Sequence, residues 1–376
     1  MARSVVLLAS CALLAFAAVP ERDYLVFVAS EATDQIALIR FGPAGARVER
    51  TRQVGFNPSE PDGPHGLAVS PDGRSYFVST AHGAPSGYLW KFSTEGDTAH
   101  GHVELGMFPA SLQISPDGFY AYVVNFNLYG DMVPSSVSVV STADMQEIAR
   151  LETCAMPHGS RFNASGSKHY SVCMMADMLI EIDTRGLAVA RHFMLTRASE
   201  HGMAGKPRTH AARAPGGGHG MDAPTANDTR CSPTWAVPAP NGERVYVACN
   251  AANDIVEIDA VDWKLLRRIP AGNGVYNLAL THDGRVLIGT NKRDQSVSLI
   301  EVASGKELAR LETKRTVVHG VAISDDDRYA FISVEGYGAE PGTVEVIDLN
   351  ARTVVASVDV GQMAGGIDFW RSEPAR

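Results

Sequence analysis

The sequence lacks an excess of positive charge. Its 376 residues include 33 Lys and Arg against 42 Asp and Glu, a formal net charge of −9 at pH 7, and no stretch gathers a basic stripe. Proteins that bind nucleic acid need such a stripe to neutralise phosphates, so no nucleic-acid partner is expected. With 45% apolar and 20% charged residues, the composition also excludes a disordered chain and a polytopic membrane protein.

Long apolar runs are also missing, except for one from Val5 to Val19. This run is too short to span a bilayer, and the small residues of Ala15-Phe16-Ala17 suit a signal peptidase. Residues 1–17 are therefore predicted to be a cleaved secretory signal, which places the mature protein in the periplasm or outside the cell, with no transmembrane segment. Residues 8–11 also resemble a lipoprotein cleavage box, but the apolar run continues past it, so lipid anchoring is the lesser alternative.

Glycine and proline are abundant, with 35 and 20 residues, and show no collagen periodicity. Such a composition favours many short strands joined by tight turns. Six turn tetrapeptides recur between alternating apolar runs at intervals of roughly 40 to 50 residues, the spacing of a propeller blade, with one longer interval where the insertion lies. The six turns are residues 70–73, 115–118, 163–166, 239–242, 281–284 and 324–327.

The repeats also predict how the ring closes. Six complete units begin near residues 64, 107, 154, 231, 273 and 315. Ahead of them lie three strands (24–30, 35–41 and 47–54), and the chain ends with one unmatched strand at 365–370. This last strand completes the first unit and removes the free sheet edge. We therefore predict one all-β domain over residues 18–376, a seven-bladed β-propeller with four antiparallel strands per blade and an insertion at 196–230 between blades 4 and 5.

The repeat unit resembles a known family. Residues 64–80 and 233–259 best keep its pattern, in which a Pro-x-Gly-x-Ala-x-Ser-Pro-Asp-Gly stretch precedes a Tyr-Val-Ala strand. This unit is similar to the YVTN repeats of seven-bladed propellers, and the resemblance covers nearly all of the mature chain. It implies the fold but not the function, because these propellers include surface-layer proteins, lactonase-like enzymes, haem-binding domains and metal carriers. No Cys-x-x-Cys-His motif is present, so covalent c-type haem is not expected.

Three histidines occupy the same position of the repeat, at the start of the innermost strand. They are His65, His158 and His319, in blades 2, 4 and 7. The innermost strands begin, and the second strands end, at one rim that we call the upper face. Three imidazoles converging there on an open position suit zinc or copper. The alternative is that each ring simply bonds a neighbouring carbonyl or a channel water.

The four cysteines left after signal removal fall into two equivalent pairs. Cys173 and Cys249 end second strands, while Cys154 and Cys231 lie just before the first strands of the same blades. Reflecting the chain about each turn brings the members of each pair together. Cys154–Cys173 and Cys231–Cys249 are therefore the predicted disulfides. The alternative is thiolate ligation of a metal beside His158.

Thioethers and further imidazoles also gather near the upper face. Met174 and Met175 follow Cys173, and because adjacent strand residues face opposite ways, one of the two is expected to be exposed or to face a ligand. The insertion 196–230 has almost no core-forming residues, so it is predicted to be a loop that reaches over the channel mouth. Its candidate metal ligands are His201, Met203, His210, His219 and Met221.

The main functional hypothesis is an extracytoplasmic copper- or zinc-binding propeller of the metallochaperone kind. The three channel histidines would form its site, and the insertion would be a lid or a delivery arm toward a metal transporter or acceptor protein. Alternatives are a lactonase-like hydrolase or a cofactor-dependent oxidoreductase, whose histidines act as bases or hold a metal-bound water. No Ser/His/Asp order or phosphate-binding loop supports an enzyme independently. A third alternative is an interaction scaffold without chemistry.

Overall fold

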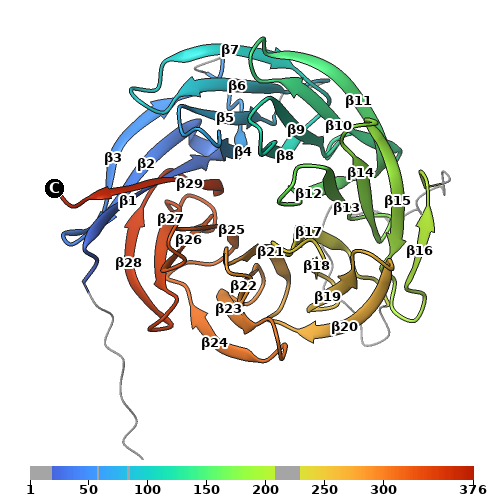
Figure 1. The fold of residues 1–376 in the computed structure, drawn as a ribbon. Coiled ribbons are helices and arrows are strands. Elements are labelled where there is room, and N and C mark those ends of the chain that lie inside the picture. The colour runs from blue at the N-terminus through green and yellow to red at the C-terminus, as the bar shows by residue number, and fades with distance from the viewer. Residues whose placement is uncertain (1–18, 57–58, 83–84, 208–228) are drawn as a thin grey trace, which may run out of the picture.

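The structure is a ring of seven antiparallel sheets around a central channel (Figure 1). It is a computed structural model that describes residues 19–56, 59–82, 85–207 and 229–376. The predicted signal, residues 1–17, lies outside this range. The one helical segment among the described residues is a single 3-10 turn, η1 (Glu31–Thr33), so no described helix could cross a membrane.

The seven-bladed propeller predicted from the repeats is confirmed, and the strands of each blade follow one another from the channel outward. Blade 1 contains β29 (Ala364–Pro374), β1 (Arg22–Ser30), β2 (Gln35–Gly42) and β3 (Gly45–Gln53). Blade 2 contains β4 (Pro64–Val69), β5 (Ser75–Thr80), β6 (Tyr88–Ser93) and β7 (Ala99–Glu104). Blade 3 contains β8 (Pro109–Ile114), β9 (Tyr120–Asn125), β10 (Pro134–Ser141) and β11 (Gln146–Ala155).

The remaining blades follow the same order, with one addition. Blade 4 contains β12 (Pro157–Phe162), β13 (Lys168–Cys173), β14 (Met178–Asp183), β15 (Ala188–Met194) and a fifth strand, β16 (His201–Ala204). Blade 5 contains β17 (Pro233–Pro238), β18 (Arg244–Cys249), β19 (Asp254–Asp259) and β20 (Lys264–Pro270). Blade 6 contains β21 (Val275–Leu280), β22 (Val286–Asn291), β23 (Ser296–Glu301) and β24 (Glu307–Glu312). Blade 7 contains β25 (Val318–Ile323), β26 (Tyr329–Val334), β27 (Thr343–Asp348) and β28 (Thr353–Asp359).

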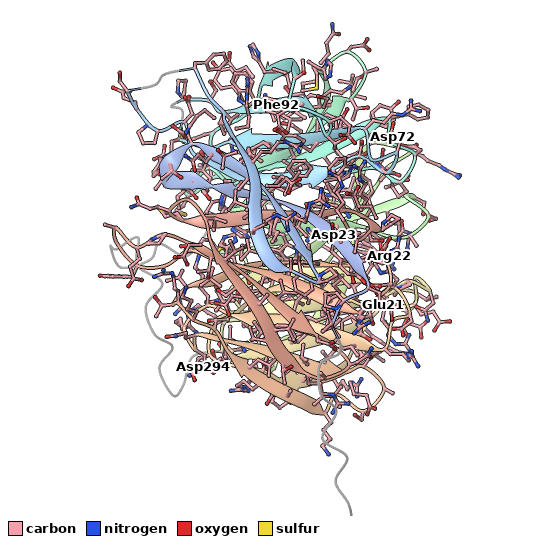
Figure 2. All side chains as sticks on the ribbon, turned by 90° about the vertical axis from the view of Figure 1, so that its left-hand side faces the viewer. Glu21, Arg22, Asp23, Asp72, Phe92 and Asp294 are labelled. Atoms are coloured by element: carbon pink, nitrogen blue, oxygen red, sulfur yellow. A yellow bond between two sulfur atoms is a disulfide. The ribbon has the colours of Figure 1, made fainter. Side chains whose placement is uncertain are left out.

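The recurring turns connect the first and second strands of a blade at the rim opposite the upper face, which we call the lower face. In blade 2, Asp72 accepts a hydrogen bond from the Ser70 hydroxyl (2.6 Å) and another from the backbone N–H of Arg74 (3.0 Å). Gly73 has φ +67°, a conformation that glycine adopts without strain. The Ser-Pro-Asp-Gly sequence thus suits this tight turn. Figure 2 views the ring edge-on. The lower face is on the right, where Asp72 and Arg22 are labelled, and the upper face is on the left, where Asp294 is labelled.

The core lies between the blades. Middle strands are sandwiched between two neighbouring sheets, so they are buried on both faces; β19 buries five of its six residues. The second strands of five blades each bury a tyrosine ring, with at most 2% of the residue exposed. These tyrosines are Tyr76, Tyr122, Tyr170, Tyr246 and Tyr329. Packing of this kind makes each blade depend on its neighbours.

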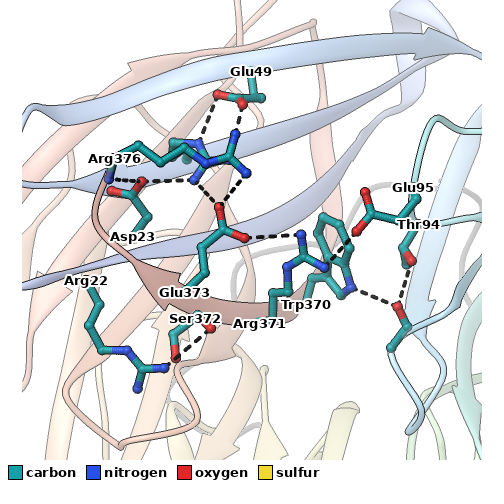
Figure 3. A network of polar contacts seen from close by, with 12 residues as sticks. Arg22, Asp23, Glu49, Thr94, Glu95, Trp370, Arg371, Ser372, Glu373 and Arg376 are labelled. Atoms are coloured by element: carbon teal, nitrogen blue, oxygen red, sulfur yellow. Dashed lines mark hydrogen bonds and ion pairs between the residues drawn. The ribbon is translucent and has the colours of Figure 1, made fainter.

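The C-terminal strand closes the ring as predicted. β29 pairs with β1 from Arg22↔Pro374 at the lower face to Ser30↔Ala364 at the upper face. A buried cation reinforces this join, because the Arg40 guanidinium contacts Asp23 of β1 (2.9 Å) and Glu373 of β29 (2.8 Å). Figure 3 shows this network around the C-terminal strand. Both ends of the chain are therefore held in one blade.

Both predicted disulfides are present, Cys154–Cys173 with 5.9 Å and Cys231–Cys249 with 4.4 Å between Cα atoms. Thiolate ligation beside His158 is therefore wrong, since all four sulfurs are used in bridges. Cys154 differs from the prediction in its blade: it lies in β11, the outer strand of blade 3. The first bridge thus ties blade 3 to blade 4, while the second lies within blade 5.

Removal of the Cys154–Cys173 bridge is expected to lower the free energy of unfolding by about 3 kcal/mol, because the bridge closes a loop across 19 residues. Urea unfolding of the paired variant Cys154→Ala/Cys173→Ala measures this loss. A reducing agent should lower the midpoint of the wild type further than that of the paired variant, which keeps only the second bridge. An unchanged midpoint in the variant would show that the bridge contributes nothing.

The insertion between blades 4 and 5 differs from the prediction. Residues 201–204 form β16, which pairs with β15 on the outer edge of blade 4. Gly202 allows this approach, since a Cβ there would lie 2.2 Å from Cδ1 of Trp263. Glu200 is also held by Arg268 of blade 5 at 2.7 Å. Contrary to the expected loop over the channel mouth, this part of the insertion packs against the outside of the ring.

Candidate functional site

The three equivalent histidines do surround the upper end of the channel. His65, His158 and His319 are the second residues of β4, β12 and β25, and all three line one cavity. The ring centroids of His65 and His319 are 5.5 Å apart. The shared position in the repeat therefore placed these side chains correctly.

The orientation of the His158 ring is fixed by contacts at both of its nitrogens. Its Nδ1 lies 2.8 Å from the carbonyl oxygen of Thr234, and its Nε2 lies 3.0 Å from the hydroxyl of Tyr276. Burial lowers the pKa of His158 to about 3, so the ring is neutral. With both nitrogens engaged, this ring has no free lone pair for a metal. Within the described ranges, no group of three or more His, Cys, Asp or Glu side chains is arranged to hold a metal ion. The geometry thus gives no support to the three-histidine metal site.

Glu31 is the centre of a different constellation, which the sequence pattern did not predict. It begins the turn η1 at the upper end of β1, and its carboxylate oxygens lie 2.5 Å from Nε2 of His82 and 3.2 Å from Nδ1 of His65. The approach to His65 meets the distance of an ion pair but not the angle of a hydrogen bond. One carboxylate thus contacts two imidazoles at the channel mouth.

The charges of this cluster follow from its contacts. Burial raises the pKa of Glu31, but His65 and His82 together outweigh it, so the net shift is well below the usual range. The hydrogen bond that His82 donates to Glu31 raises the pKa of His82 and favours its imidazolium form. Glu31 is therefore an anion, held by its contacts with both His65 and His82.

A buried lysine from blade 6 also lies at the mouth. Lys292 contacts Glu335 at 2.8 Å, and its ammonium lies 4.4 Å from the ring centroid of Tyr276. Burial lowers the pKa of Lys292, but Tyr276 and Glu335 raise it by more, so the amine stays charged. Glu335 also lies 3.7 Å from Nε2 of His319. Blades 6, 7 and 1 thus give the mouth a polar side of acids, imidazoles and one ammonium.

These polar residues share a position that the sequence could have revealed. Glu31, Lys292 and Glu335 each come directly after the second strand of their blade, at the upper face. The full set at this position is Glu31, Ala81, Phe126, Met174, Asn250, Lys292 and Glu335. Comparing only the starts of the innermost strands finds the histidines but not the charges that face them.

The side of the mouth formed by blades 3 and 4 is apolar. Phe108, Phe126, Met156 and Met174 form one buried cluster there, and Met175 packs against it half-buried. Met174 and Met175 thus contact the same cluster, which differs from the predicted opposite orientations. The strand β13 ends at Cys173, so strand alternation no longer applies to the turn that follows.

The two ligands of the insertion that the structure describes lie away from this site. His201 and Met203 lie in β16, on the outer edge of blade 4. His210, His219 and Met221 lie outside the described residues. The structure thus brings together His65, His158 and His319 of the predicted set, together with Glu31, His82 and Lys292.

Comparison with known proteins shows the same fold. No family model and no curated protein matches the chain. Among solved structures, the periplasmic gluconolactonase of Pseudomonas aeruginosa is 17% identical with a TM-score of 0.67, covering 92% of this chain and 99% of that one. A chain of the hydrazine synthase of Kuenenia stuttgartiensis is 19% identical with a TM-score of 0.61, covering 82% and 91%. A protein of unknown function from Desulfotomaculum acetoxidans is 15% identical with a TM-score of 0.65, covering 92% and 98%. At these identities the likeness is one of fold: the seven-bladed propeller that lactonases also use.

Proposed function

We propose that this protein is a hydrolase of small lactones, acting at the mouth of the propeller channel outside the cytoplasm. The observation that carries the proposal is the contact of one buried carboxylate, Glu31, with two imidazoles, beside the charged Lys292. A carboxylate that orients an imidazole is the arrangement that general-base hydrolysis uses. The fold shared with a periplasmic gluconolactonase and the two disulfides, which persist in oxidising compartments, also support it.

His65 is the base in this proposal. Its Nδ1 faces Glu31, while Nε2 has no hydrogen-bond partner among the described residues. Nε2 takes a proton from water as the water oxygen bonds to the lactone carbonyl carbon. The tetrahedral intermediate then collapses, the ring C–O bond breaks, and the proton passes to the leaving alkoxide to give a hydroxy acid. Glu31 stabilises the imidazolium that forms in between.

Lys292 and the apolar side complete the site. The Lys292 ammonium places positive charge beside the imidazoles, where it favours the oxyanion of the intermediate. Met107 and Met175, which are half-buried against the Phe108 cluster, offer a surface for the carbon skeleton of the substrate, because thioethers adapt to irregular apolar shapes. The mouth thus has one side suited to the reaction and another suited to binding.

The substitution Glu31→Gln is expected to lower kcat/KM for the best substrate of a lactone panel at least about 100-fold, since an amide cannot stabilise the imidazolium. The matched control is Glu95→Gln, an exposed glutamate near the lower face whose loss should leave turnover unchanged. Assays with and without a chelator separate this mechanism from the metal hypothesis. Turnover that survives Glu31→Gln, or that disappears with the chelator, would contradict the proposed mechanism. The latter result would instead favour the copper or zinc site.

A further inference from the structure

The three histidines line a small cavity in the channel. Its volume is about 30 Å³, room for about two water molecules. Besides the histidines, its lining includes Arg161 of β12, Trp235 of β17 and Asn277 of β21. These side chains come from blades 4, 5 and 6, and the proposed lactone hydrolysis uses none of them.

Several polar atoms that line this cavity have no partner within the described part of the chain. Trp235 is 7% exposed, and its Nε1–H donates no hydrogen bond. His319 is 4% exposed, and its Nδ1 is likewise unpaired. The Oδ1 of Asn277 is also unpaired, and rotation of that amide by 180° would present its N–H₂ donors instead. Buried polar groups are normally satisfied, so these atoms point to an occupant.

Arg161 determines the charge of that occupant. Its guanidinium lies 4.9 Å from the ring centroid of Trp235, and its Nη1 donates to the carbonyl of Ser160 at 2.9 Å. No carboxylate of the described residues lies within 4.0 Å of it. The nearby Asp368 attracts the guanidinium but lies outside that distance, and its oxygens accept hydrogen bonds from the backbone N–H groups of Val69 and Phe369. Burial lowers the pKa of Arg161 to about 10, which still leaves it charged at pH 7. The guanidinium thus has no carboxylate in direct contact, and an anion in the cavity would supply that contact.

We propose that the channel cavity binds a small monovalent anion of halide size, held by the guanidinium of Arg161 and the indole N–H of Trp235. Water alone would satisfy the indole but would leave the guanidinium without an anion in direct contact. A volume of about two water molecules favours a monatomic anion over phosphate or the carboxylate of a substrate. The cavity shares His65 with the Glu31 cluster, but the proposed anion ligands Arg161 and Trp235 take no part in the hydrolysis, so the site stands whether or not the protein hydrolyses lactones.

Bromide is a suitable probe, in crystals and in solution. Crystals soaked in sodium bromide should show an anomalous peak in the cavity. In solution, the melting temperature should rise with bromide concentration more than with methanesulfonate at equal ionic strength, because an ion that binds the folded state stabilises it. No peak, together with equal melting curves in the two salts, would overturn the proposal.

Two variants and one control sharpen this test. Arg161→Met should abolish the difference between the two salts, and Trp235→Phe should weaken bromide binding about tenfold by removing one donor. Trp235→Phe keeps an aromatic ring at this position, so it still tests the proposal if Arg161→Met does not fold. The control is Arg371→Met, which removes an arginine stacked on Trp370 but paired with Glu95 near the lower face; it should keep full bromide binding. A peak that persists in Arg161→Met would mark an adventitious ion only and would refute the proposed site.

Discussion

A chain that ends at Met363 is expected to lose the cooperative fold of the whole ring. Such a chain lacks β29, which forms the inner strand of blade 1 and packs between β4 and β25. Its loss would expose the full length of β1 as a sheet edge and uncover two hydrophobic clusters, because Ile367 belongs to one and Trp370 to the other. Circular dichroism and urea unfolding should show no cooperative transition near that of the full chain.

A single substitution in β29 tests the closure of the ring without removing the whole strand. Trp370 is 8% exposed, its ring centroid lies 5.5 Å from that of Phe27, and its Nε1–H donates to the carbonyl of Gly73 in the turn of blade 2. Trp370→Ala should lower the free energy of unfolding by about 3 to 5 kcal/mol, the usual loss for a large buried aromatic side chain. Trp370→Phe keeps an aromatic ring and should lose less. If the truncated chain and Trp370→Ala both unfolded at the wild-type midpoint, the C-terminal strand would not be what closes the ring.

Acid is expected to destabilise the fold strongly through two buried histidines. Burial lowers the pKa of both His158 and His169 to about 3, against about 6.5 in the unfolded chain. Above pH 6.5 both histidines are neutral in the folded and in the unfolded chain, so they do not change the free energy of unfolding. As the pH falls below 6.5, the unfolded chain gains protons that the folded chain cannot accept, so each histidine costs about 1.4 kcal/mol per pH unit. At pH 4.5 the two together should lower the free energy of unfolding by about 5 kcal/mol.

His169 allows a direct measurement of half of this effect. It is fully buried between Tyr122 and Phe162, and neither ring nitrogen has a partner among the described residues. The stability of His169→Phe relative to the wild type should therefore rise by about 2.5 kcal/mol between pH 7 and pH 4.5. Urea unfolding at several pH values gives this difference. His100→Gln, on the exposed outer strand β7, is the control and should show no such trend. A pH-independent difference for His169→Phe would contradict a buried, neutral imidazole at this position.

Much of the fold could be predicted because it repeats. The turn tetrapeptides and the alternating strands are local signals, and the lone strand at 365–370 had no place other than blade 1. The cysteine pairs followed from the same register. The insertion could not be placed in this way, because β16 has little apolar character of its own. Its position depends on backbone pairing with β15 and on Trp263, a residue of the next blade.

The site was predicted only in part, and its chemistry was not. The shared position of His65, His158 and His319 put three imidazoles around the channel, which the structure bears out. Their individual roles depend on partners far away in the chain. Tyr276, whose hydroxyl is hydrogen-bonded to Nε2 of His158, is 118 residues away from it in sequence. Glu31 lies 51 residues before the His82 that it binds. Periodicity identifies the rim on which a residue lies, but not the side chain that it meets there.

The pairing of Arg22 with Pro374 has a practical consequence for anyone who handles this protein. The two described ends of the chain meet at the lower face, on the far side of the ring from Glu31 and the histidines. A purification tag, a fluorophore or a tether to a solid support can therefore be joined at either end without covering the channel mouth. The same closeness makes the protein a good subject for circular permutation, with new ends cut into an exposed turn and the old ones linked by a short peptide.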